Sequence, residues 1–322
     1  MGPREKVVIV ARQSSLDELV AKFNTEGQAK FYLEHAGQDF APVQRRHRHY
    51  YASLDDVRTH VPAGMKVQVI DRSYLPQFSF GEDDLVVVVG PDGLVVNTAK
   101  YLNGQPILAV NPDPEQIEGV LLPFTTHEFP RALGAAIRGE MRLQRITMAE
   151  AVLNDGQRLL AFNDLFVGVR SHVSARYQIS HGARSEEHSS CGILVSTGAG
   201  STGWLRSVYA GAAAVAQAMG ARFEGATIGG KRAKVPPADG RFAWDAAQLV
   251  FAVREPWPSK TTGASVVYGT VTPDQPLVVA SHMAEGGVIF SDGIEADFLS
   301  FTAGLTATIG ISDRTANLIM PG

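Results

Sequence analysis

The chain has 322 residues, of which 45% are hydrophobic and 19% are charged, so it is long enough for two domains that each bury a core. Its formal net charge of -4 excludes the chain-wide positive field that holds nucleic acid or a membrane surface. The single cysteine, Cys191, excludes an intramolecular disulfide and a cysteine-rich metal site, and it fits a reducing compartment.

The N-terminal stretch "MGPREKVVIVARQSS" has no long apolar region and no small-residue cleavage site of the kind that a secretory signal needs. No apolar run in the chain reaches the length of a membrane-spanning helix. We therefore expect a cytoplasmic protein without a membrane or nucleic-acid partner.

The first 143 residues alternate between strand-like and helix-like segments. Short apolar, β-branched runs predict strands buried on both faces at 6–11, 65–72, 85–89 and 106–111. Helical segments are predicted at 16–37, 53–61, 94–102 and 127–143. This alternation predicts a parallel sheet, in which ligands gather at the carboxyl ends of the strands.

From about residue 143 the chain consists of short strand-like runs bounded by turn residues, which predicts a β-rich domain. One helix is expected within it at 203–220, and the Gly- and Pro-rich stretch 220–242, with its basic cluster, predicts a surface loop. The expected domain ranges are 1–125 for an α/β domain and 126–301 for a β-rich domain, with 302–322 packing back on the first.

Asp92 lies in the turn "GPDG" (90–93) between the strand 85–89 and a helix. Glycines allow close backbone approach, and a carboxylate at this position can accept a proton as a general base. The alternative interpretation is that Asp92 caps the following helix, and the turn by itself favours the cap.

The stretch "GILVSTGAGSTGWLRS" (192–207) runs from a strand through small residues into a helix. Its backbone N–H groups and the hydroxyls of Ser196, Thr197, Ser201 and Thr202 are of the type that binds phosphate or ribose oxygens. It lacks the Gly-Lys-Ser/Thr ending of a P-loop. A plain Gly/Ser turn is the alternative.

Two further stretches are ambiguous. Asn163 and Asp164 suit ribose hydroxyls or an amide edge, although the pair by itself favours an Asx turn. The stretch "RRHRHYY" (45–51) can reach a phosphate, but a solvated helix face or loop is the simpler interpretation. The nine histidines show no metal-ligand spacing, so we expect no metal site built by the protein alone.

Four stretches together, in order, resemble the NAD kinases. They are "GPDG" (90–93), "AVN" (109–111), "ND" (163–164) and "STGAGSTGW" (196–204). The continuation "AVNPDPEQIEGVLLPF" is similar to the mitochondrial-type branch of that family, and so are "FAVREPWPSK" and "FSDGIEADF". The resemblance covers about residues 5 to 313.

The resemblance implies an α/β N-terminal domain with a Rossmann-like parallel sheet and a β-rich C-terminal domain, the NAD kinase/diacylglycerol kinase-like fold. It also implies phosphoryl transfer, from ATP with Mg²⁺ or Mn²⁺ or from polyphosphate, to the 2′-hydroxyl of the adenosine ribose of NAD. Asp92 would then be the catalytic residue. The nucleotide-binding residues would be Gly90, Gly93, Asn111, Asn163, Asp164, Arg176, Thr202, Gly203 and Ser207. A homodimer or homotetramer is expected.

Three departures from the family pattern bear on activity. Pro91 replaces a glycine and removes an N–H donor, Leu94 replaces a hydroxyl residue, and Asp164 is one methylene shorter than the family's Glu. These departures favour a second hypothesis, a NAD(P)-binding protein with a degenerate kinase site. A third hypothesis is a lipid kinase of the diacylglycerol kinase type, which shares a GGDG turn, although the "ND" pair and the 196–204 loop favour a dinucleotide.

Overall fold

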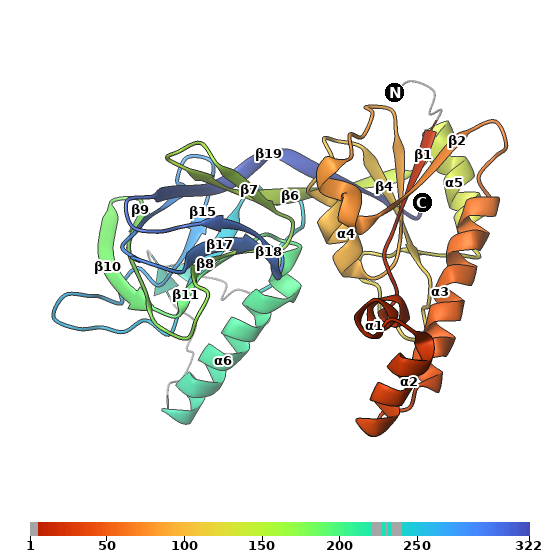
Figure 1. The fold of residues 1–322 in the computed structure, drawn as a ribbon. Helices are drawn as coiled ribbons and strands as arrows, with labels where there is room; N and C mark the ends of the chain where they lie inside the picture. Colours follow the sequence, from red (N-terminus) through yellow and green to blue (C-terminus); the bar gives the residue numbers. More distant parts are fainter. Residues whose placement is uncertain (1–5, 221–226, 229–230, 233–239) are drawn as a thin grey trace. The chain divides into compact units, whose positions relative to one another are not determined.

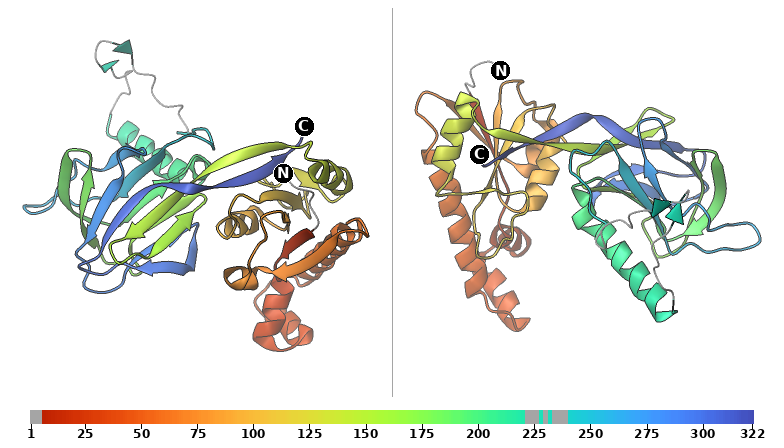
Figure 2. Two further views of the ribbon diagram at one scale, coloured as in Figure 1. Left: turned by 90° about the horizontal axis from the view of Figure 1, so that it is seen from above. Right: turned by 180° about the vertical axis from the view of Figure 1, so that it is seen from behind.

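The computed structural model describes residues 6–220, 227–228, 231–232 and 240–322, and the chain divides into two compact units. The first unit comprises Met1–Gln144 and Ala316–Gly322, and the second unit comprises Arg145–Thr315. Strands β6 (Arg142–Leu153) and β19 (Thr306–Met320), which run side by side, each contain a point where the chain changes unit (Figure 2).

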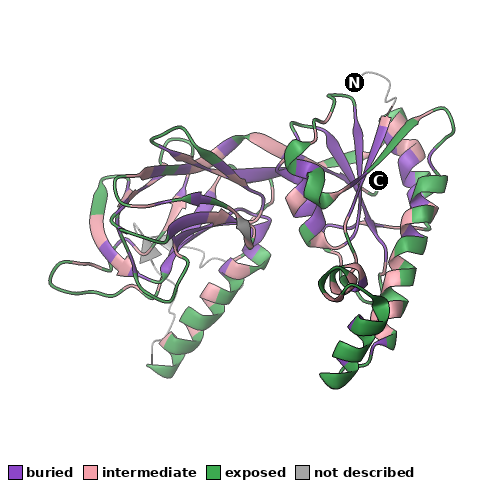
Figure 3. Cartoon of the chain, in the orientation of Figure 1, coloured by how far each residue is buried: buried purple, intermediate pink, exposed green. Residues whose placement is uncertain are grey.

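The core of the first unit is a parallel sheet in which β4, β3, β1 and β2 lie side by side in that order. Their bounds are Lys6–Ala11 for β1, Lys66–Asp71 for β2, Leu85–Val89 for β3 and Pro106–Asn111 for β4. The outer edge of β4 pairs in parallel with β5 (Phe124–Thr125) and with the end of β19. Figure 3 shows β1, β3 and β4 buried, as their unbroken apolar runs predicted.

One predicted strand differs from its expectation. The run at 65–72 was expected to be buried on both faces, but β2 exposes four of its six residues, including Val67 and Val69. The reason is position: β2 is the edge strand and, among the described strands, pairs with β1 alone. Apolar content does not distinguish an edge strand from a central one, so this expectation was wrong.

Helices cover both faces of this sheet (Figure 1). Helices α3 (Ala41–Thr59) and α5 (Phe129–Arg138) share a core with one face. Helix α4 (Asp92–Ala99) contacts β3, β4 and the 3-10 helix η1 (Arg72–Gln77). The predicted range 126–301 counts α5 with the β-rich domain; its side chains Phe129 and Leu133 are buried in the core of the first unit.

The helical segment predicted at 16–37 forms two helices, α1 (Ser15–Phe23) and α2 (Glu26–His35). Asn24 separates them in a left-handed conformation with φ 66°, which ends a helix and which Asn tolerates better than most residues. Ser14 and Thr25 accept hydrogen bonds from the first turns of α1 and α2.

The second unit is built mainly from antiparallel strands in two sheets. One sheet has the order β15-β14-β11-β8-β17-β18, and the other has β10-β9-β16-β19, with β6 pairing with β19 and β7 pairing with β6. The strand bounds are Arg158–Ala161 (β7), Asp164–Val169 (β8), Ala175–His181 (β9), Arg184–Ser190 (β10), Gly192–Ser196 (β11), Leu249–Arg254 (β14), Tyr268–Val271 (β15), Leu277–Ser281 (β16), Gly287–Ser291 (β17) and Ile294–Ser300 (β18). Apolar side chains from both sheets form one buried core, as in a β-sandwich.

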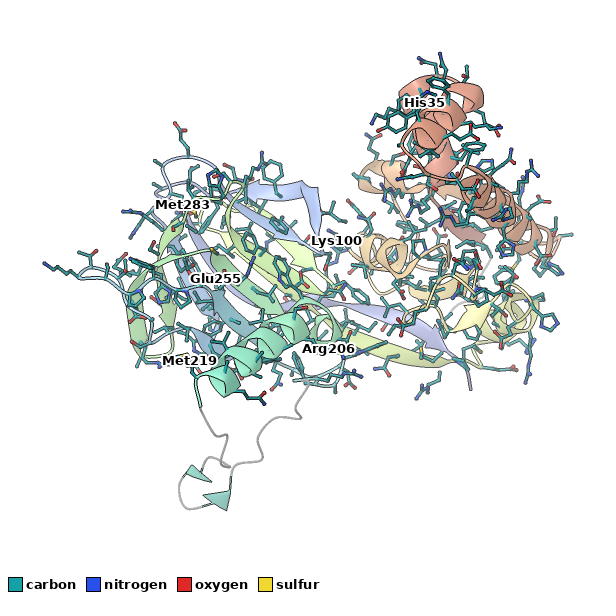
Figure 4. The ribbon with its side chains drawn as sticks, turned by 90° about the horizontal axis from the view of Figure 1, so that it is seen from below. His35, Lys100, Arg206, Met219, Glu255 and Met283 are labelled. Atoms are coloured by element: carbon teal, nitrogen blue, oxygen red, sulfur yellow. The ribbon has the colours of Figure 1, made fainter. Side chains whose placement is uncertain are left out.

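The predicted helix at 203–220 is α6 (Trp204–Ala218), which packs on the face of β11 and β14 opposite the sandwich core. Figure 4 shows Arg206 near its start and Met219 just past its end. The predicted loop 220–242 lies largely outside the described residues, which include in this stretch only β12 (Thr227–Ile228), β13 (Lys231–Arg232) and its flanking ends. Within the described part of the chain, no helix combines the length and apolar character needed to cross a bilayer.

Candidate functional site

The turn "GPDG" follows the carboxyl end of β3. Gly90 extends the strand, with its N–H donating to the Val110 carbonyl of β4 at 3.4 Å. A Cβ at Gly90 would come within 2.9 Å of a Leu94 methyl carbon, so Leu94 occupies the space that a larger residue would need. Leu94 is 3% exposed and its N–H donates to the Pro91 carbonyl at 2.8 Å. The turn is therefore closed by apolar packing, with no hydroxyl at Leu94 and no N–H at Pro91.

Asp92 is the first residue of α4 and is half-buried. Pro91 is the N-cap residue, and no side chain caps this helix, so the interpretation of Asp92 as a helix cap is wrong. One carboxylate oxygen, Oδ1, accepts the Leu121 N–H at 2.6 Å. Oδ2 has no hydrogen-bond partner among the described residues. The carboxylate is thus held in one orientation with one oxygen available.

Asn111 ends β4 and is 5% exposed. Its amide nitrogen donates to the Ile117 carbonyl at 2.9 Å, and its amide oxygen accepts the Asp113 N–H at 3.0 Å. Gly119, with φ 66°, lies so close that a Cβ there would be 2.6 Å from the Asn111 amide nitrogen. Asn111 therefore shapes the loop 112–119 with both of its polar atoms.

In the second unit, the Asn163–Asp164 pair lies at the corner between β7 and β8. The carboxylate of Asp292 holds this corner: its oxygens accept the backbone N–H groups of Phe162 (3.1 Å), Asn163 (2.7 Å) and Asp164 (3.2 Å). The Asp292 N–H in turn donates to the Asp164 carbonyl at 2.9 Å. Sequence reasoning missed Asp292, although its Asp-Gly turn with φ 57° after β17 was a possible signal.

The side chains of the pair are left for other partners. The Asn163 amide is half-buried and makes no hydrogen bond to a described residue. Asp164 is 7% exposed, and burial, followed by the nearby Asp292 carboxylate, raises the pKa of Asp164 to about 7. At neutral pH this carboxyl group is therefore divided between its acid and ionised forms, so it can either donate or accept a hydrogen bond.

The loop 196–203 packs directly on this corner. Thr197 donates its N–H to the Asn163 carbonyl at 2.9 Å and its hydroxyl to the Phe162 carbonyl at 2.6 Å. A Cβ at Gly200 would overlap the Asn163 carbonyl, and a Cβ at Gly198 would overlap the Ala243 carbonyl. The glycines are therefore required by close backbone packing, and the two sequence motifs come together as one structure.

The hydroxyls of this loop serve the loop itself. Those of Ser196, Thr197 and Ser201 are buried and donate to backbone carbonyls at 3.1, 2.6 and 2.6 Å. The expectation that all four hydroxyls can reach a ligand was wrong for these three, because the backbone of so tight a turn needs internal donors. Thr202 is exposed, with its hydroxyl 3.3 Å from the Ala199 carbonyl.

The remaining predicted residues of the second unit lie on its surface. Gly203 is the N-cap residue of α6, and its N–H donates to the Gly200 carbonyl at 2.9 Å. Ser207 is exposed in the first turn of this helix. Arg176 is exposed on β9, and no hydrogen bond or ion pair joins it to the corner or to the loop 196–203 within the described residues.

No protein-family model matches the chain. It is 26% identical over 250 residues to the mitochondrial NAD kinase 2 of Homo sapiens, covering 62% of this chain and 57% of that protein. It is 29% identical over 132 residues to the NAD kinase of Geobacter metallireducens, covering 38% of this chain and 46% of that one. The chain thus spans less than two thirds of the length of either relative.

Solved structures give the same result for the fold. The yeast NADH kinase complexed with NADH matches all of this chain and 84% of its own, with a TM-score of 0.59 at 13% identity. An Archaeoglobus fulgidus NAD kinase in complex with ATP matches 97% and 92%, with a TM-score of 0.55 at 16% identity. The predicted resemblance and the predicted fold class are confirmed.

Proposed function

We propose that this chain, which is similar to NAD kinases in sequence and in fold, transfers a phosphoryl group to the 2′-hydroxyl of the adenosine ribose of NAD and so makes NADP. The donor in this proposal is ATP or inorganic polyphosphate. The observation that carries it is the Asp92 carboxylate, held by the Leu121 N–H through one oxygen while the other has no partner among the described residues.

Asp92 acts as the general base in this proposal. Its bond to Leu121 prevents the carboxylate from turning, so the second oxygen is ready to accept the proton of an attacking hydroxyl. Phosphoryl transfer depends chiefly on positioning and charge neutralisation, and the nucleophile needs only modest help with its proton. Gly93 is exposed and a Cβ there would meet no neighbour, so phosphate oxygens can approach the turn at this residue. Gly90 is assigned to the phosphates by the resemblance alone.

The dinucleotide binds to the second unit in this proposal. The Asn163 amide, which has no hydrogen-bond partner among the described residues, and the Asp164 carboxyl bind ribose hydroxyls or an amide edge. Thr202, Gly203 and Ser207 are exposed at the end of the loop that packs on this corner and at the start of α6. Arg176 is assigned to a phosphate by the resemblance alone. Asn111 acts indirectly, since both its polar atoms are already bonded within the loop 112–119.

No three His, Cys, Asp or Glu side chains among the described residues gather in a way that can hold a metal ion. In this proposal the Mg²⁺ or Mn²⁺ arrives bound to the phosphates of the donor. Self-association into a dimer or tetramer is also part of the proposal, and sedimentation velocity of the purified chain tests it.

The test is NADP formation from NAD with ATP or polyphosphate as donor and Mg²⁺ or Mn²⁺ present. Asp92→Asn keeps the oxygen that accepts the Leu121 N–H and removes the base, so we expect kcat to fall about 100-fold or more while NAD still binds. The matched control is Asp83→Asn, an exposed carboxylate just before β3, which should leave turnover unchanged. Full activity in Asp92→Asn would disprove the assignment.

The alternative function is NAD(P) binding without turnover. Pro91 and Leu94 favour it, because the turn has lost one N–H and holds a buried apolar side chain close to Gly90. Calorimetry that detects NAD or NADP binding, together with no turnover with any donor, would establish this alternative, and any turnover that depends on Asp92 would eliminate it.

A further inference from the structure

Helix α3 carries a basic stretch to which the proposed reaction assigns no role. Arg45, Arg46 and Arg48 are all exposed, and none of them makes a hydrogen bond or an ion pair with another described residue. Like charges three residues apart on a helix repel each other. A chain with a net charge of -4 has enough carboxylates to neutralise these arginines, yet it leaves them without partners.

These arginines line an open pocket of about 750 Å³, which the loop that follows β4 borders on the other side. We call it the arginine pocket; its lining consists of Pro42, Arg45, Arg46, Arg48, His49 and residues 113–116. A smaller pocket of about 230 Å³ shares Arg46 and His49 with it and reaches Arg12, Gly90 and Pro91. The two pockets therefore adjoin along α3 and end at the turn that carries Asp92.

The wall opposite the arginines is fixed in place. The Pro112 carbonyl accepts hydrogen bonds from His49 Nε2 at 2.8 Å and from the Ser53 hydroxyl at 3.1 Å. The same loop is held further along by Asn111 and, at Leu121, by Asp92 itself. A preformed wall lowers the entropy cost of ligand binding.

The arrangement of charges in the arginine pocket favours direct hydrogen bonds from arginine to an anion over long-range electrostatic attraction. Asp113 and Glu115 belong to its lining, but neither forms an ion pair with an arginine within the described residues. Guanidinium groups bind phosphate oxygens through paired N–H donors. The carboxylates of the lining are acceptors and do not take part in this contact. Apart from His49 the lining has no aromatic ring on which a base could stack, so the phosphates are the part of a ligand that this pocket recognises.

We infer that the arginine pocket binds a chain of condensed phosphates, the phosphate chain of the phosphoryl donor. The identification of this ligand as the phosphoryl donor rests on the proposed function. The anion site itself rests on the geometry of α3 and the loop 113–116. Nucleoside triphosphates and inorganic polyphosphate share this chemistry. The site supplies positive charge next to a turn in which Pro91 has no N–H to offer.

The test is calorimetric binding of tripolyphosphate, ATP and a polyphosphate of about fifteen phosphates to the full chain at low and moderate salt. The double variant Arg45→Gln with Arg48→Gln removes two charges and keeps good helix formers. The control is Arg58→Gln, an exposed arginine on the same helix that lines neither pocket. Thermal unfolding monitors the fold of each variant.

We expect the double variant to bind at least one of these ligands about 10-fold or more weakly, since each lost charge-assisted bond weakens binding several-fold, while Arg58→Gln stays within about 2-fold of the unmodified chain. Losses for ATP and tripolyphosphate as large as the loss for the longer chain identify a triphosphate group, such as that of a nucleoside triphosphate, as the ligand. A loss confined to the longer chain identifies inorganic polyphosphate.

Three results would overturn the inference: no binding of any condensed phosphate, equal loss in Arg58→Gln, or competition by a DNA duplex as effective as by tripolyphosphate. Binding with the expected pattern in a chain that never makes NADP would retain the anion site and reject the proposed function. NADP formation with an unchanged KM for the donor in the double variant would retain the proposed function and reject the anion site.

Discussion

Asp164 makes the stability of the second unit depend on pH. Its carboxyl group is 7% exposed and makes no hydrogen bond to a described residue. Burial, and then the Asp292 carboxylate, raises its pKa from 3.8 to about 7. The perturbation that tests this is Asp164→Asn, which keeps the shape of the side chain and removes its charge.

The magnitude follows from the size of this shift. A rise from 3.8 to about 7 is about three pKa units, and at about 1.4 kcal/mol per unit it corresponds to about 4 kcal/mol. Because the pKa is raised on folding, the folded chain binds the proton more tightly than the unfolded chain. The stabilisation by protonation is therefore complete below pH 3.8, falls as the pH rises towards 7, and is lost above it.

Urea unfolding followed by tryptophan fluorescence measures this effect where it arises, since Trp204, Trp244 and Trp257 are the three tryptophans of the chain and all belong to the second unit. We expect Asp164→Asn to be more stable than the unmodified chain by about 4 kcal/mol at pH 8, and by less than half of that amount at pH 5. Taking the difference between the two proteins cancels the titration of all other groups. A difference that stays constant from pH 5 to pH 8 would refute the reasoning.

Other predictions concern the same region and the loop after β4. Gly200→Ala should lose about 3 kcal/mol of unfolding free energy, because its Cβ would overlap a backbone carbonyl, whereas Gly211→Ala, with open space in α6, should gain about 1 kcal/mol; thermal unfolding of both measures the contrast, and equal effects would contradict it. Asp292→Ala leaves three backbone N–H groups without their acceptor and should cost about 3 kcal/mol, measured by urea unfolding, and a loss below about 1 kcal/mol would show that water replaces the carboxylate. Asn111→Ala should release the loop 112–119 and speed its hydrogen exchange; unchanged protection of the Asp113 N–H would show that the amide does not hold it.

Much of the fold could be predicted from sequence because its signals are local. The unbroken apolar runs of β1, β3 and β4 and the helical spacing of α5 and α6 are visible in short windows, and all five elements form where they were expected. The exposure of β2 was not predictable in this way, because an edge position depends on which strands pair, and a one-dimensional pattern does not contain that information.

The candidate site divides in the same manner. The positions of Asp92, the Asn163–Asp164 pair and the small-residue loop were visible as motifs, and their roles stay predictions. Asp292 holds the corner although it lies more than a hundred positions away from it along the chain, and no local sequence pattern indicates such a contact.

The sequence by itself determined an α/β unit followed by a β-rich unit, because strand and helix periods and turn glycines act over a few residues. It also showed, in order along the chain, the motifs that resemble those of the NAD kinases. Tertiary structure alone decided which polar atoms remain available. Close packing of the loop 196–203 on its corner consumes three hydroxyls, and the loop 112–119 consumes both polar atoms of the Asn111 amide. Within the described part of the chain, one oxygen of Asp92, the Asn163 amide and the arginines of α3 have no partner and remain available to a ligand.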